Sequence, residues 1–62
     1  MLYKITWWWV NAMDSPEIIE LSADTFNGIK DVATAISKCR YISRVTVMDQ
    51  YNHLLIVIHN PT

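Results

Sequence analysis

The 62-residue chain contains one glycine, one cysteine and five basic residues. Phosphate-binding loops need several glycines whose backbone approaches the ligand closely, so Gly28 alone excludes the glycine-rich nucleotide-binding motifs. Cys39 has no second cysteine to pair with, which excludes a disulfide within the chain. A lone thiol is typical of a reducing compartment, so we expect a cytoplasmic protein.

Long apolar segments are also missing. The run Leu54–Ile58 has five residues, far fewer than the about 18–20 that a membrane-spanning helix needs. The first residues hold one lysine followed by threonine and three tryptophans, where a signal peptide would have a long aliphatic segment. We therefore expect neither a signal peptide nor a membrane span.

Groups suited to catalysis or metal binding are few and far apart. His53 and His59 are six residues apart, about 20 Å along a straight strand, so they cannot bind the same ion. No histidine is placed to activate a serine or cysteine nucleophile. Glu17 and Glu20 fall on opposite faces of a strand, and Asp24 suits a helix cap better than an acid catalyst. We expect a protein without enzyme activity, metal or cofactor.

All three tryptophans of the chain stand side by side at positions 7–9. In an extended segment, neighbouring side chains point to opposite faces. Trp7 and Trp9 then enter the core with Tyr3 and Ile5. Trp8 leaves by the other face, and the same alternation sends Lys4, Thr6 and Val10 there too. An indole on the outside of so small a protein favours a contact surface, because tryptophan is enriched at interface anchor positions.

Residue patterns predict four strands and one helix. Alternating apolar positions predict strands over 2–10, 17–21 and 42–49, and the continuous apolar run within 53–59 predicts a fourth strand. Asp14-Ser15-Pro16 indicates a turn, so the first two strands should form a hairpin with a loop of about six residues. The resulting β-β-α-β-β order predicts an α+β fold in one domain over 1–62. Its four-stranded, mostly antiparallel sheet carries one helix on one face.

The helix is expected from Ala23 or Asp24 to Lys38 or Cys39, with Ser22 or Asp24 as its cap. Its buried side should hold Phe26, Ile29, Val32, Ala33 and Ile36. Charges at its two ends suit the helix dipole, with Asp24 at the start and Lys38 and Arg40 at the end. Residues 53–59 are apolar on both faces, and parity alone leaves open which side meets the helix.

Self-association would compensate for the small size of the chain. Hydrophobic residues make up 52% of it, whereas a domain of this length buries only about 60% of its unfolded surface. A two-fold homodimer is the simplest assembly. It would use either the sheet face that the helix leaves uncovered or a sheet edge.

We interpret the chain as a small, non-catalytic protein-interaction module, an inhibitor or adaptor of the kind that phages and mobile elements encode. The partner is a protein whose identity the sequence does not give. The first 24 residues carry one base and four acids, and the rest four bases and two acids, so one end is acidic and suits a basic partner. The expected contact residues are Trp8 with Lys4, Arg44 and Met48 around it, and an acidic rim of Asp14, Glu17 and Glu20.

The alternative is a protein that binds single-stranded nucleic acid. Such proteins combine aromatic platforms with basic side chains, and Trp8, Lys4 and Arg44 on an open sheet face fit that description. Five basic residues and a net charge of −1 argue against it, because affinity for phosphate backbones comes largely from positive charge.

Overall fold

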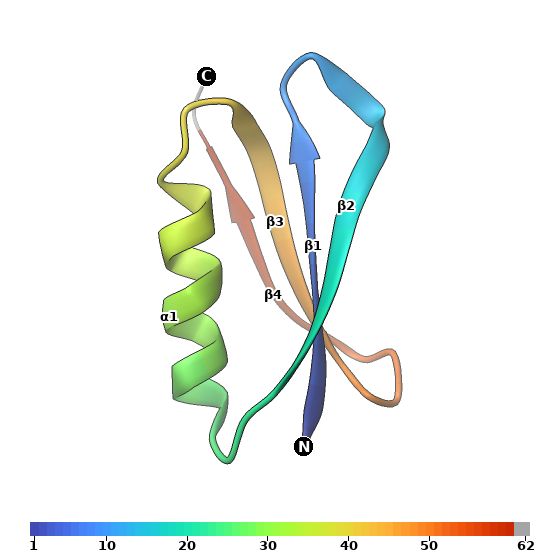
Figure 1. Cartoon of the computed structure of the whole chain (residues 1–62), viewed down its shortest axis with the longest axis vertical. Coiled ribbons are helices and arrows are strands. Elements are labelled where there is room, and N and C mark those ends of the chain that lie inside the picture. The colour runs from blue at the N-terminus through green and yellow to red at the C-terminus, as the bar shows by residue number, and fades with distance from the viewer. Residues whose placement is uncertain (61–62) are drawn as a thin grey trace.

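The computed structural model describes residues 1–60, which form one antiparallel sheet and one helix in the order β-β-α-β-β (Figure 1). The strand order across the sheet is β2-β1-β3-β4. The α+β class and the element order predicted from the sequence are confirmed. The elements are β1 (Leu2–Trp9), β2 (Ala12–Ser22), α1 (Phe26–Ser37), β3 (Ile42–Asp49) and β4 (Leu54–His59).

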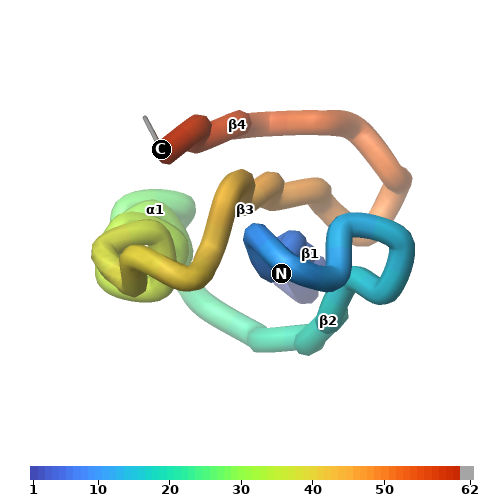
Figure 2. The backbone as a smooth tube through the Cα atoms, turned by 90° about the horizontal axis from the view of Figure 1, so that it is seen from above, coloured from blue at the N-terminus to red at the C-terminus, as the bar shows by residue number. Residues whose placement is uncertain are grey.

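The helix lies on one face of the sheet, mainly along β3 and β4, and β2 and β4 form the two edges (Figure 2). The core forms where α1 meets the central strands β1 and β3. Alternation places Tyr3 and Ile5 on the helix side of β1, as predicted, and Val45 and Val47 on the helix side of β3. The buried apolar residues are Tyr3, Ile5, Ile29, Ala33, Ile42, Val45 and Val47.

Strand β2 is longer than the sequence predicted, and the expected six-residue loop is wrong. Val10 and Asn11 alone connect β1 to β2, so Val10 lies in the turn and not on the strand face. The segment with Asp14-Ser15-Pro16 belongs to β2 as a wide bulge, because the pairs Trp7–Glu17 and Trp9–Ala12 leave four residues of β2 opposite Trp8. An edge strand tolerates this proline, since the missing N–H can face solvent.

The helix is shorter at both ends than predicted. Thr25 occupies the N-cap position without a side-chain hydrogen bond, so neither Ser22 nor Asp24 caps it. The first turn of α1 holds no acidic residue and the last turn holds no basic residue. The expected interaction of charged side chains with the helix dipole is therefore not supported. Ile29 and Ala33 are buried as predicted, whereas Val32 is 37% exposed, because α1 covers only part of the sheet.

The side chain of Asn60 holds the helix C-terminus against the sheet. Its Nδ2 donates to the carbonyl oxygens of Ser37 at 2.5 Å and Ile42 at 2.6 Å, with a longer contact to Cys39 at 3.4 Å. The Asn60 backbone N–H donates to Ser43 O at 3.0 Å. One side chain thus satisfies carbonyls at the end of the helix and at the start of β3, where regular pairing is lost.

Strand β4 presents Ile56 and Ile58 to the core, while Leu55 and Val57 are exposed. This settles the question that parity left open. The ladder with β3 is irregular between Val47 and Met48, so β4 carries one extra residue near its start. Within residues 1–60, no helix is long and apolar enough to cross a membrane.

Candidate protein-interaction surface

The face of the sheet turned away from α1, called the outer face below, carries a row of two threonines between two apolar residues. Thr46 alternates with the buried Val45 and Val47, so it points away from the helix. Ladder partners share a face. The row across the four strands is therefore Ile18, Thr6, Thr46 and Val57. Ile18 is 58% exposed and Val57 40%, whereas Thr6, between larger neighbours on the central strand, is buried.

A second row lies next to the first and is mixed in character. Its members across the four strands are Glu20, Lys4, Met48 and Leu54. Leu54 is 59% exposed, and the Lys4 ammonium donates to Asn52 Oδ1 at 3.3 Å. The structure thus brings the predicted contact residues Lys4 and Met48 together as direct cross-strand neighbours. It adds Leu54, whose position the sequence did not show because it depends on the irregular ladder of β4.

Trp8 and Arg44 form the third row together with His59. As predicted, Trp8 lies on the face opposite Trp7 and Trp9, whose rings meet edge to face with centroids 6.4 Å apart. One face of the Trp8 indole ring is covered by another side chain. The guanidinium of Arg44 lies over it, with Cζ 3.9 Å from the ring centroid, and the residue is partly buried. Within the described part of the chain, Arg44 Nε is buried and has no hydrogen-bond partner.

The three acids of the expected rim are exposed but do not gather on one face. Asp14 lies in the bulge of β2, and Glu17 is the ladder partner of Trp7 on the helix side. Glu20 is opposite Lys4 on the outer face. Of the three acids, only Glu20 is placed on the outer face by a ladder pair.

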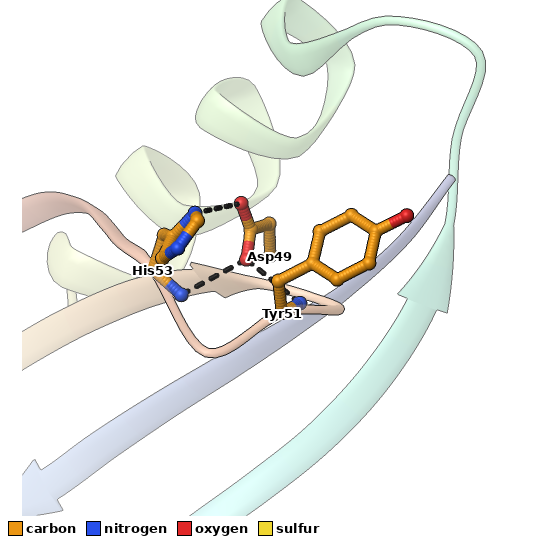
Figure 3. Close-up of polar contacts among 3 residues, drawn as sticks. All are labelled: Asp49, Tyr51 and His53. Carbon is orange, nitrogen blue, oxygen red and sulfur yellow. Dashed lines mark hydrogen bonds and ion pairs between the residues drawn. The ribbon is translucent and has the colours of Figure 1, made fainter.

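A polar cluster closes the turn between β3 and β4 (Figure 3). Asp49 Oδ1 accepts hydrogen bonds from the backbone N–H of Tyr51 at 2.8 Å and of His53 at 2.9 Å. Its Oδ2 lies 3.3 Å from His53 Nδ1. The bond from the His53 backbone, assisted by that from Tyr51 and by the His53 ring, lowers the pKa of Asp49 despite its partial burial.

The role of this cluster is structural. Asn52 has a φ of 64°, a left-handed conformation that asparagine tolerates in turns. The strands predicted over 42–49 and 53–59 imply a turn between them, but not that the Asp49 carboxylate organises it. The sequence signal for such a turn is an aspartate at its first position, because the carboxylate can accept hydrogen bonds from backbone N–H groups two or more residues later.

Residues 1–60 enclose no pocket and hold no group of three metal-ligating side chains. Comparison of the chain with protein-family models, with curated proteins and with solved structures gave no match. The outer face is therefore the candidate site, and its function has to be argued from its own chemistry.

Proposed function

We propose that this protein binds a partner protein through the outer face of its sheet. The observation that carries the proposal is the set of exposed apolar side chains on that face, Ile18, Leu54 and Val57, next to the Trp8–Arg44 stack. Ile18 lies on the edge strand β2, and Leu54 and Val57 lie on the opposite edge strand β4, so they flank the stack rather than form one contiguous patch. Exposed apolar side chains on one face of a small domain favour an interaction site, and tryptophan and arginine are frequent anchors in such sites.

The charges on this face indicate which partner surface fits it. Lys4 and Arg44 are its basic residues and Glu20 its acidic one, so the outer face is locally positive although the whole chain carries −1. A complementary partner offers an apolar patch bordered by carboxylates.

Binding of this kind would act by occlusion, as in an inhibitor or an adaptor, and phages and mobile elements encode many proteins of this size. The lone thiol of Cys39 favours the cytoplasm as the place of action. We also propose that the protein works as a homodimer, because association adds buried apolar area to a core that is small in a chain of this length.

Binding of single-stranded nucleic acid is the second candidate, since Lys4, Trp8 and Arg44 share the outer face. The stack argues against it, because the Arg44 guanidinium occupies a ring surface on which a base would lie. Titration with an oligonucleotide separates the two functions. Salt-reversible quenching of tryptophan fluorescence would favour nucleic acid, and an unchanged signal would favour a protein partner.

The proposal is tested by capturing partners from a lysate of the source cells on immobilised protein. Ile18→Ser should lose the retained protein, whereas Val32→Ser should keep it, because Val32 is an exposed apolar residue of the helix on the other side of the sheet. Circular dichroism establishes that both variants are folded. Equal retention by the two variants would contradict a contact through the outer face.

A further inference from the structure

The outer edge of β4 is an unprotected pairing surface. The strand lies at the end of the sheet and pairs only with β3 within residues 1–60. Its residues Leu54–His59 include no proline and no lysine, arginine, aspartate or glutamate. Natural proteins normally block such an edge with charge, proline or a bulge, because its free N–H and C=O groups accept another strand. The one irregularity of the β3–β4 ladder lies near the start of β4, between Leu54 and Ile56, and the strand pairs regularly with β3 from Ile56 to His59.

The opposite edge carries these blocking features. Strand β2 contains Pro16, a bulge of four residues and three exposed acids. Pairing of β4 with β2 of another copy would meet these obstacles and would also be head-to-tail, which leads to open chains rather than a closed dimer. The contrast between the edges selects pairing of β4 with itself.

We propose that two copies of this chain pair antiparallel through their β4 edges, about a two-fold axis at Val57, to form a continuous eight-stranded sheet. This specifies the homodimer put forward above and does not depend on the partner protein. The Asn60 N–H is directed toward β3 by its bond to Ser43 O. Because this direction alternates along an antiparallel strand, the N–H and C=O groups of Val57 and His59 face the free edge.

This alternation restricts the register, and we place the axis at Val57 because its backbone groups face the free edge. With the axis at Val57, this residue exchanges both backbone hydrogen bonds with the partner's Val57, and His59 lies opposite the partner's Leu55. On the helix side, Ile56 lies opposite the partner's Ile58 and extends the core row across the interface. No formally charged pair is brought together, since β4 has no acid, lysine or arginine.

The two-fold axis is perpendicular to the continuous sheet. Both helices therefore lie on one side of the dimer, and both outer faces lie on the other side. Ile18 and the Trp8–Arg44 stack belong to strands away from the junction and stay accessible. The dimer would therefore present two copies of the proposed binding surface side by side, which favours a partner that is itself two-fold symmetric or repeated.

Charge substitution at the axis tests the pairing, because each copy meets its own substitution there. The wild type should show twice the 7.2 kDa chain mass by light scattering. Val57→Lys alone and Val57→Asp alone should each give monomers, since like charges oppose each other. An equimolar mixture of the two variants should recover the dimer. Ile18→Ser should keep the dimer mass, so loss of partner capture and loss of dimerisation are separable.

Three results would overturn the proposal: a wild type of 7.2 kDa up to millimolar concentration, charge variants that remain dimeric, or a mixture that remains monomeric. Amide hydrogen exchange on the wild type covers the case in which the variants fail to fold. The amides of Val57 and His59 should be protected at high concentration and lose that protection on dilution. Rapid exchange of both amides in a dimeric sample would equally exclude this edge.

Discussion

The guanidinium of Arg44 lies over the indole ring of Trp8, with its Cζ atom 3.9 Å from the ring centroid. The two residues are ladder partners on the adjacent central strands β3 and β1. A delocalised cation over an indole is held by the ring quadrupole and by stacking. The pair therefore fixes both side chains on the outer face before any partner arrives, which lowers the entropy cost of binding.

A double-mutant cycle measures the strength of this stack. Arg44→Met keeps the aliphatic stem and removes the cation, and Trp8→Leu removes the ring. We expect a coupling free energy of about 0.5–2 kcal/mol from urea unfolding of the two single variants and the double variant. The cycle of Arg40→Met with Tyr41→Leu is the control, since Arg40 Cζ lies 4.9 Å from the Tyr41 ring centroid and both residues are exposed. A coupling no larger than in this control would show that the stack does not fix the surface.

The Asp49 turn makes stability depend on acid pH. Because the pKa of Asp49 is lowered in the folded state from 3.8, the ionised carboxylate stabilises the fold above about pH 4, and this contribution disappears as the pH falls through the folded pKa. Asp49→Asn retains an oxygen that accepts the backbone hydrogen bonds but cannot ionise. The wild type should therefore unfold at higher urea concentration than Asp49→Asn near neutral pH, and the two midpoints should converge in acid. A difference that stays constant with pH would contradict the role of the charge.

Asn60 should be important for stability although it lies near the chain end. Asn60→Ala removes the Nδ2 donor that serves the Ser37 and Ile42 carbonyls, and leaving such groups unpaired costs about 1–3 kcal/mol. We expect a lower free energy of unfolding by this amount. Asn27→Ala, at an exposed helical position, should change it by less than about 0.5 kcal/mol. Equal effects of the two substitutions would mean that the Asn60 side chain does not hold the helix end.

Gly28 offers a stabilising substitution. A Cβ atom at this position meets nothing within 4 Å, so the glycine is not needed for close packing of the helix. Gly28→Ala should raise the free energy of unfolding by about 0.5–1 kcal/mol through helix propensity. Ala35→Gly, at an exposed position of the same helix, should lower it by a similar amount. A lower free energy of unfolding in Gly28→Ala would contradict the finding that a Cβ atom at this position has no close neighbour.

The central strands and the buried face of the helix were predictable because their periodicity is strong. Val45 and Val47 are two residues apart on a strand, and Ile29 and Ala33 follow helical spacing, so these four core positions could be assigned locally. The opposite placement of Trp8 relative to Trp7 and Trp9 follows from the same alternation. All three tryptophans belong to strand β1, so the triplet is extended as this prediction requires.

The edges could not be predicted in the same way. Asp14-Ser15-Pro16 is a pattern typical of turns, yet here it forms a bulge within the edge strand β2. An edge strand can contain this proline because one side of the strand is unpaired. Alternation predicted that Arg44 and Trp8 share the outer face, but their stacking and the exposure of Leu54 depend on the register between strands far apart in sequence. Local patterns carry no information on such long-range registers. The structure is therefore needed to show which residues of different strands are neighbours on the outer face.

Photo-crosslinking in the source cells tests the contact through the outer face most directly. A benzophenone side chain replaces Ile18 in one variant and Val32, exposed on the helix, in a second. We expect irradiation to give covalent adducts with a second protein from position 18 and none from position 32. Adducts from position 32 alone, or equal adducts from both positions, would contradict binding through the outer face of the sheet.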